Sequence, residues 1–150
     1  MSRAMGLDVG DKTVGVAVSD LLGLTAQPVT TLRRTNLEAD LAALVRLCEE
    51  HEVERIVVGL PLNMNGTEGP RAALARKFAE KLRQKTGREV ELWDERLSTA
   101  EVQRVLIAGD ASRKKRREVV DTLAAQVILQ GWMDARSARA ARDLDHEENP

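Results

Sequence analysis

The spacing of hydrophobic residues predicts three short strands at the start of the chain. Residues 4–9 and 13–19 are Val-rich runs, and residues 10–12 between them (Gly-Asp-Lys) are typical of a turn, so the two runs are expected to form a β-hairpin. A third strand is expected to begin after Pro28. The first part of the sheet is therefore predicted to be a three-stranded meander.

A helix follows, and the pattern then alternates between strand and helix. Apolar residues recur at helical spacing from Asn36, a candidate N-cap, to a polar end near His51. Residues 55–60 form a continuous apolar run of the kind found in strands that are covered on both faces. After a loop, Pro70 is expected to open a second helix that ends at Gly87, since glycine is favoured as a C-cap.

The C-terminal third completes the predicted fold. A fifth strand is expected at residues 89–93, and a capping-box spacing predicts a short helix over 98–109. A basic loop should then lead to a last helix over about 118–136. Residues 137–150 are polar and charged, with too little apolar surface to offset the entropy of ordering them. We expect one α/β domain over residues 1–136, with a mixed five-stranded sheet flanked by helices, and then a flexible charged tail.

The composition narrows the class of protein. Of the 150 residues, 43% are hydrophobic and 31% are charged, which is typical of a soluble globular protein. The N-terminus has no apolar run long enough for a signal peptide and no later stretch could span a bilayer, so we expect a cytoplasmic location. The lone cysteine, Cys48, permits no internal disulfide and fits simple core packing. Because the net charge is only −1, nucleic-acid binding would have to depend on local basic patches.

Three acidic residues are candidates for a catalytic site. Asp8 interrupts the apolar pattern of a first strand that is expected to lie centrally, where a carboxylate is costly unless it is paired. Glu95 follows the fifth strand, at an end of the sheet where loop residues gather to form sites. Asp121 shares a helix face with Ala125 and Ile128, and the small residues on that face should let Asp121 approach Asp8.

Each of these acidic residues also has an ordinary structural explanation. Asp8 could bond the turn at Gly10, and Glu95 could form a surface salt bridge with Arg96 or another basic neighbour. Asp121 could simply be favoured by the positive end of its own helix. The residues alone leave these alternatives open.

A run of five cations precedes the last predicted helix: Arg113, Lys114, Lys115, Arg116 and Arg117. The positive end of a helix dipole favours anions, so the run breaks a local rule. A docked polyanion would explain the violation, and a solvated charge run is the ordinary alternative. We expect this basic loop, together with Lys12 in the first turn, to hold substrate phosphates.

The acidic trio indicates a kind of metal and a kind of reaction. Carboxylates with no histidine nearby suit hard, oxygen-preferring cations, so Mg²⁺ or Mn²⁺ is expected rather than zinc. Two such ions about 4 Å apart would neutralise the carboxylates and clamp the attacking and leaving oxygens of a phosphodiester. We therefore expect a metal-dependent nuclease, a hydrolase in which Asp8, Glu95 and Asp121 are both metal ligands and catalytic residues.

Four segments of the chain fit one known pattern in the same order: DVGDKTVGVAVSD (8–20), VVGLPLNMNGTE (57–68), DERLST (94–99) and VVDTLAAQVIL (119–129). Together they resemble the YqgF family, also called RuvX or Holliday-junction-resolvase-like proteins. The resemblance implies a ribonuclease-H-like fold and a role in processing the 5′ end of pre-16S ribosomal RNA. It also implies that the family's acidic trio falls on Asp8, Glu95 and Asp121 and its basic loop on residues 113–117. Asn65 stands where relatives often carry Asp, so we assign it no metal role.

Other functions remain open at this stage. Cleavage of four-way DNA junctions would favour a symmetric homodimer, because two strands are cut about the junction. A non-catalytic module could instead bind nucleic acid or a ribosomal assembly partner. An ATPase half of the sugar-kinase type is disfavoured, because those enzymes close two such domains on the nucleotide. Since aromatic residues make up only 2% of the chain, we expect recognition of nucleic-acid backbone and shape, with binding that falls steeply as salt rises.

Overall fold

The computed structural model describes residues 3–97 and 113–148, and for 113–121 and 145–148 it describes the backbone alone. Five strands form one sheet in the order β3-β2-β1-β4-β5. The strands are β1 (Arg3–Val9), β2 (Thr13–Ser19), β3 (Ala26–Arg33), β4 (Val53–Leu60) and β5 (Glu89–Asp94). β1, β2 and β3 pair antiparallel, whereas β1, β4 and β5 run parallel. The predicted meander and the mixed five-stranded sheet are confirmed.

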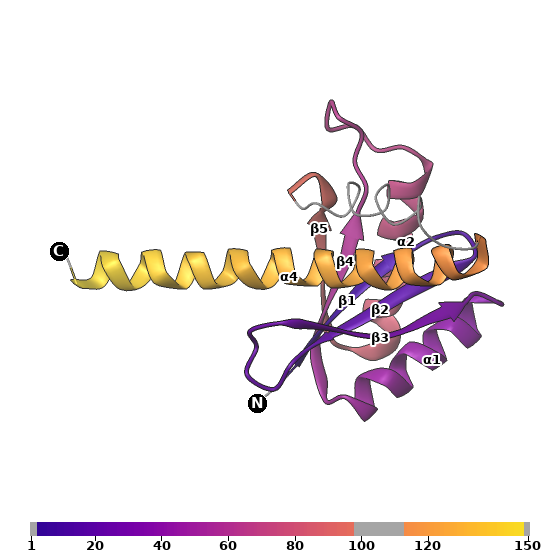
Figure 1. The fold of residues 1–150 in the computed structure, drawn as a ribbon, viewed down its shortest axis with the longest axis horizontal. Coiled ribbons are helices and arrows are strands. Elements are labelled where there is room, and N and C mark those ends of the chain that lie inside the picture. The colour runs from indigo at the N-terminus through magenta and orange to yellow at the C-terminus, as the bar shows by residue number, and fades with distance from the viewer. Residues whose placement is uncertain (1–2, 98–112, 149–150) are drawn as a thin grey trace.

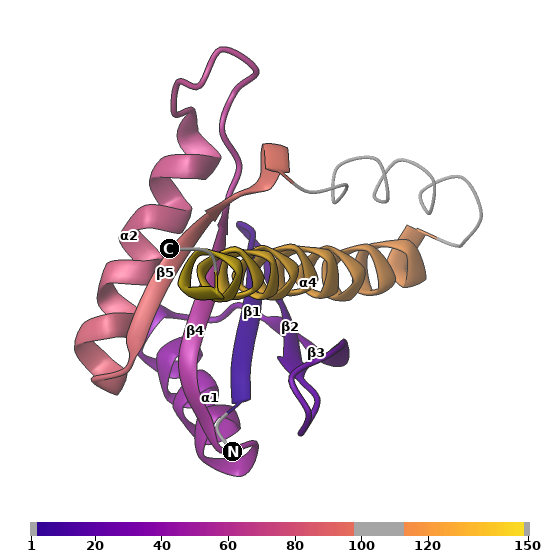
Figure 2. The same ribbon diagram turned by 90° about the vertical axis from the view of Figure 1, so that its left-hand side faces the viewer.

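Helices cover both faces of this sheet. They are α1 (Leu37–Glu50), α2 (Pro70–Thr86) and α4 (Arg113–Glu148), with a short 3₁₀ turn, η1 (Glu95–Leu97), directly after β5. α1 and α2 lie on one face, and α4 crosses the other face (Figures 1 and 2). The predicted helix over 98–109 lies outside the described residues. Within the described part of the chain, no helix is long and apolar enough to cross a membrane.

The ends of the first two helices follow the local sequence signals. The N–H of Ala39 donates to Asn36 Oδ1 at 2.9 Å, which caps α1 as predicted. α2 begins at Pro70 and closes on Gly87, whose φ of 69° is the left-handed conformation that glycine adopts without strain. The first cap marks the turn from β3 into α1, and Gly87 marks the turn from α2 into β5.

Side chains alternate between two cores. On the α1/α2 face, β1 contributes Met5, Leu7 and Val9 to a large aliphatic cluster that also contains the buried Cys48. Burial raises the pKa of the Cys48 thiol, which keeps it protonated, as expected for a core residue. On the other face, β1 presents Ala4 to a smaller cluster built around α4. Because successive side chains of a strand point to opposite faces, Asp8 belongs to the α4 face.

The structure corrects the predicted bounds of the last helix. α4 begins at Arg113, so the basic run occupies its first turns instead of a preceding loop. Lys and Arg are good helix formers, and this propensity outweighs the weak dipole penalty. α4 also continues through residues 137–148, for which we expected a flexible tail. That segment is rich in Ala and Arg and extends an existing helix, so it needs no new nucleus. The yellow end of α4 projects beyond the sheet in Figure 1.

Candidate active site at the carboxyl edge of the sheet

Asp8 is buried near the carboxyl end of the central strand β1. Only 4% of its surface is exposed, and its backbone pairs with Gly15 of β2. The adjacent turn is satisfied by other groups, since the N–H of Gly10 donates to the Thr13 carbonyl and Arg34 donates to the Gly10 carbonyl. A buried carboxylate on a central strand needs a compensating charge or a metal. Its predicted central, buried position is confirmed.

Gly6 brings α4 against the sheet close to Asp8. A Cβ at Gly6 would lie 2.6 Å from Leu129 Cβ and 2.9 Å from the carbonyl oxygen of Ala125. These distances are shorter than real carbon contacts, so a side chain at this position would push the helix away. The helix therefore passes directly over the strand that carries Asp8, two residues further along.

Glu95 is turned into the protein by the residues on either side of it. Arg96 pairs with Asp94 at 2.8 Å, and the Arg96 N–H also donates to Asp94 Oδ1 at 3.0 Å. Hydrogen bonding from the Arg96 side chain lowers the pKa of Asp94, so this turn stays ionised and closed. Glu95 itself is only 7% exposed. In the described structure Arg96 thus pairs with Asp94, and no ion pair between Arg96 and Glu95 is observed there.

Gly59 of β4 lies between the two buried carboxylates. A Cβ at Gly59 would lie 3.2 Å from the carboxyl carbon of Glu95, so the Glu95 carboxyl group rests over this glycine. The parallel register pairs Leu7 with Val58, which places Asp8 beside Gly59 on the neighbouring strand. Adjacent strands are about 4.8 Å apart. Asp8 and Glu95 therefore approach each other on the α4 face of the sheet.

The backbone of α4 brings Asp121 to the same row of the sheet. Thr122 Oγ1 lies 2.6 Å from Thr31 Oγ1 on β3. Thr31 pairs with Gly15, which in turn pairs with Asp8, so the helix passes over the row that contains Asp8. The side chain of Asp121 lies outside the described residues, and its role stays a prediction.

Arg71 was not predicted as a site residue, and the structure brings it to Asp8. Arg71 is the second residue of α2, and its Nη2 lies 3.9 Å from Asp8 Oδ1. Its side chain is 48% exposed, so the guanidinium faces both the buried carboxylate and solvent. The sequence signal was weak, because a single Arg after Pro70 looks like ordinary helix surface. Only the packing of α2 along the sheet shows where this side chain points.

The other predicted cations are only partly described. Lys12 is exposed in the turn between β1 and β2, at the same edge of the sheet as Asp8. Arg34 steadies this turn, since its N–H donates to the Lys12 carbonyl at 2.8 Å. Residues 113–117 form the first turns of α4, and their side chains lie outside the described part of the structure. Contact of any of these cations with substrate stays a prediction.

Asn65 has a structural role in the loop between β4 and α2. Its Oδ1 accepts hydrogen bonds from the Thr67 N–H at 3.1 Å and from the Thr67 hydroxyl at 2.6 Å. Asn63 Nδ2 donates to the same Thr67 hydroxyl at 3.0 Å. These bonds hold the loop that rises above the sheet edge in Figure 1.

The donor set fits a hard divalent cation, as far as it is described. Asp8 and Glu95 are buried carboxylates on one face, and Arg71 approaches Asp8 from outside at a distance longer than a direct hydrogen bond. Among the described residues, no group of three or more His, Cys, Asp or Glu side chains is close enough to hold a metal ion. The third ligand that we expect, Asp121, belongs to the part whose side chains are not described.

Comparisons with known proteins identify relatives along nearly the whole chain. A family model described as "RuvX: Holliday junction resolvase" matches residues 2–135. A protein of Myxococcus xanthus named "Putative pre-16S rRNA nuclease" is 65% identical over 133 residues, covering 89% of this chain and 88% of its own. A Heliobacterium modesticaldum protein of the same name is 59% identical, covering 97% of each chain.

A solved structure shows the same fold at much lower identity. The chain of "T. thermophilus RuvC in complex with Holliday junction substrate" matches with a TM-score of 0.59 at 15% identity, covering 92% of this chain and 97% of that one. The ribonuclease-H-like fold implied by the sequence resemblance is thus confirmed. On the family match and these relatives, the chain belongs to the RuvX family.

Proposed function

We propose that this protein is a metal-dependent nuclease that hydrolyses phosphodiester bonds at the carboxyl edge of β1, β4 and β5. The observation that carries the proposal is the pair of buried carboxylates, Asp8 and Glu95, at 4% and 7% exposure on one face of the sheet. Burial of two neighbouring acids costs free energy that a stable fold does not need, and a divalent cation offsets it. Asp121 would complete the ligand set from α4.

Each described residue at this edge has a distinct part in the proposed reaction. A divalent ion, when bound, would activate water and neutralise charge on the phosphate. Asp8 and Glu95 would hold the ion with their carboxylate oxygens, and the Asp94–Arg96 pair would keep Glu95 turned inward. Arg71 would leave Asp8 and donate to a phosphate oxygen, because guanidinium groups bind phosphate well. Lys12, and the run from 113 to 117, would hold phosphates further along the strand.

The proposed substrate is a precursor of 16S ribosomal RNA, cut on its 5′ side. The names of the relatives support this substrate, and the family description supports a branched DNA junction as the alternative. A homodimer belongs to the junction alternative, since paired cuts need two sites. A ribosomal assembly partner and a cytoplasmic location accompany the RNA substrate, and both stay predictions.

The test compares two substrates in one experiment. Wild type and Asp121→Asn are incubated with a 5′-extended ribosomal RNA precursor and with a four-way DNA junction, each with Mg²⁺, Mn²⁺ or a chelator. We expect metal-dependent cutting of the RNA by wild type and loss of on the order of 10³-fold in rate in the variant, equivalent to about 4 kcal/mol. Binding measured in the chelator should persist.

A matched variant separates the loss of a metal ligand at Asp121 from the loss of any negative charge on α4. Asp134→Asn removes an exposed carboxylate from the same helix and should cut at the wild-type rate. Cutting of the junction alone would move the substrate to DNA. Intact binding without cutting by wild type, in every metal, would replace the nuclease with a binding module.

A further inference from the structure

Arg34 forms a small network at the carboxyl edge of the sheet, directly after β3. Its backbone N–H donates to the Lys12 carbonyl at 2.8 Å, and its Nη1 donates to the Gly10 carbonyl at 3.0 Å. One residue thus holds both ends of the turn between β1 and β2. That turn joins the buried Asp8 to the exposed Lys12, so its shape sets where Lys12 lies relative to the carboxylate.

The Arg34 side chain is itself held from two helices. Its Nε donates to Asp40 Oδ2 on α1 at 3.2 Å, and its guanidinium carbon lies 5.2 Å from the centre of the Phe78 ring on α2. The other Asp40 oxygen accepts from the Thr35 N–H at 3.1 Å. Both members of the ion pair are largely covered, since 16% of the Arg34 side chain and 7% of the Asp40 side chain are exposed. The guanidinium is therefore fixed in direction where it meets the turn.

Stability alone does not account for a buried ion pair at this position. Removing two charges from water offsets much of their mutual attraction, and apolar side chains of similar volume often serve a fold equally well. An arginine adds geometry, because its planar fork donates in two fixed directions, here to a carboxylate and to a backbone carbonyl. A lysine carries the same charge without the fork. The pair is thus suited to fixing the direction of the turn.

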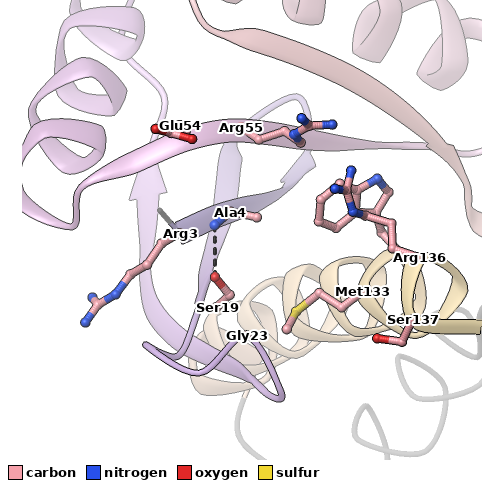
Figure 3. Close-up of a pocket in the computed structure, with 10 residues that line it drawn as sticks. Arg3, Ala4, Ser19, Gly23, Glu54, Arg55, Met133, Arg136 and Ser137 are labelled. Carbon is pink, nitrogen blue, oxygen red and sulfur yellow. Dashed lines mark hydrogen bonds between the residues drawn. The ribbon is translucent and has the colours of Figure 1, made fainter. Parts of the chain in front are cut away.

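The arginines around the cavity at the opposite end of the sheet act separately. This cavity of about 250 Å³ is lined by Arg3, Arg55 and Arg136, and Figure 3 shows the Arg3 guanidinium pointing away from the other two. Arg55 forms an ion pair with β5 at 2.7 Å, and Arg136 covers a tryptophan ring of its own helix at 4.7 Å. The hydrogen bonds of Arg34, in contrast, converge on one turn beside the candidate site.

We propose that Arg34 is a positioning residue for substrate binding, which fixes the turn over residues 10–12 so that Lys12 meets a backbone phosphate beside the buried carboxylates. This inference rests on the function proposed above, because it explains how one phosphate contact of that site is oriented. The C=O and N–H of a trans peptide point in opposite directions, so a Gly10 carbonyl turned toward Arg34 turns the Asp11 N–H away from it. The Asp11 amide therefore reports the orientation of the turn.

The test is a double-mutant cycle on binding of the 5′-extended ribosomal RNA precursor, measured in a chelator. Lys12→Ala removes the phosphate contact and should weaken binding about tenfold, with a log–log salt slope smaller by about 1. Arg34→Met removes the fork and should weaken binding about fivefold. Because Arg34 acts through Lys12, the double variant should bind no more weakly than Lys12→Ala. Effects that multiply to about fiftyfold would overturn the inference.

Asp40→Asn separates the position of the turn from the stability of the fold. Arg34→Met alone leaves the Asp40 carboxylate buried without its cation and should lower the urea midpoint of unfolding. Adding Asp40→Asn removes that charge and keeps an oxygen for the Thr35 N–H, so the midpoint should return toward the wild-type value. In this pair binding should stay about fivefold weak and the Asp11 amide resonance should stay shifted. Recovery of wild-type binding together with stability would show that Arg34 is only structural.

Two single variants identify the cause of the loss. Arg34→Lys keeps the charge without the fork and should bind nearly as weakly as Arg34→Met, whereas wild-type binding in Arg34→Lys would mean that charge acts and not geometry. Arg83→Met removes an exposed arginine that pairs with Glu80 on α2, and it should change neither binding nor the urea midpoint.

The same measurements separate this inference from the proposed nuclease. If wild type binds the precursor but cuts it with no metal, and Arg34 and Lys12 stay non-additive, the nuclease is wrong and the positioning role stands. If wild type cuts and Arg34→Met binds as wild type does, the positioning role is wrong and the nuclease stands. A wild-type protein that does not bind the precursor would overturn the positioning role together with the RNA substrate.

Discussion

The two faces of the sheet differ in what their side chains do. The face under α1 and α2 is filled by large aliphatic residues, among them Leu44 and Leu82, which are fully buried. The face under α4 carries Gly6, Ala17 and Gly59, and it has Asp8 at its edge. Large side chains maximise the apolar area removed from water, whereas small ones let a helix backbone come close to a strand.

This difference separates stability from chemistry within one sheet. The aliphatic face gains its free energy from burial and tolerates little loss of volume. The α4 face gives up part of that gain, because its small residues let the helix pass close to the strands that carry the site. Variants on the first face should therefore change the free energy of unfolding, and variants on the second should change cleavage.

The largest effect on the α4 face is expected for Glu95→Gln. The amide keeps the shape of the side chain but removes one negative charge from the proposed metal site. The cleavage rate should fall by on the order of 10³-fold. The free energy of unfolding should stay within about 0.5 kcal/mol of the wild-type value or rise above it. Single-turnover rates and urea unfolding of the same preparation measure both quantities.

A carboxylate elsewhere supplies the control for Glu95. Glu50→Gln removes an exposed charge at the end of α1 and should leave both quantities unchanged. A Glu95→Gln protein that cuts at the wild-type rate would exclude this residue from the site.

On the aliphatic face, Leu44→Ala should lower the free energy of unfolding by about 3 kcal/mol, because Leu44 is fully buried and its loss leaves a cavity. Leu144→Ala makes the same chemical change at a side chain that is 59% exposed, and it should cost less than about 0.5 kcal/mol. Urea titrations compare the two. The cleavage rate per folded molecule should match wild type in both variants. A rate that falls in Leu44→Ala but not in Leu144→Ala would show that the two faces of the sheet are not independent.

The two faces also differ in how much of their structure could be predicted from the sequence. The spacing of hydrophobic residues predicts the elements of the aliphatic face, so β1, β4 and α2 were predicted close to their observed bounds. On the α4 face the burial of Asp8 was predicted from its place in a central strand. Arg71 could not be found in this way, because its contact with Asp8 depends on how α2 packs and leaves no local signal.

The bounds of α4 were missed for a related reason. Charge and polarity indicated a loop before Glu118 and a tail after Arg136, whereas the structure is helical from Arg113 to Glu148. A packed middle segment already supplies the helix nucleus, and residues with high helix propensity extend it in both directions without needing a core. Hydrophobic periodicity reports the packed part of a helix, not its length.

Two glycine substitutions test whether close approach or carboxylate position matters more on the α4 face. Gly6→Ala meets Leu129 Cβ and a backbone carbonyl, neither of which can move alone, so it should cost about 2 kcal/mol of unfolding free energy. Gly59→Ala meets the flexible end of Ile128 at 2.5 Å and then the Glu95 carboxyl carbon at 3.2 Å. Gly59→Ala should lower the free energy of unfolding by about 1 kcal/mol. Its cleavage rate should nevertheless fall further, for each kcal/mol of lost stability, than that of Gly6→Ala.

Gly69→Ala supplies the reference for these two variants. Its new Cβ would meet only Asn63, at an ordinary 3.6 Å, so the expected cost is the roughly 0.5–1 kcal/mol by which alanine is worse than glycine as the N-cap of α2, with no effect on cleavage. If Gly59→Ala loses stability as Gly6→Ala does and cleavage falls only in proportion, then Gly59 supports packing and not the position of Glu95.

The smallest effect is expected for Arg71→Ala. This variant should improve the apparent affinity for metal and lower kcat/KM. Arg71 competes with a metal for Asp8, so removing it should lower the Mn²⁺ concentration needed for half-maximal activity. It should also lower kcat/KM about tenfold, equivalent to ~1.4 kcal/mol, because the substrate phosphate loses a guanidinium donor. Arg71→Lys should restore part of kcat/KM. Arg76 lies on the same helix and forms an exposed pair with Glu68 of the preceding loop, so Arg76→Ala should change neither quantity. If Arg71→Ala weakens metal binding and cleavage together, Arg71 supports the structure of the site and does not contact substrate.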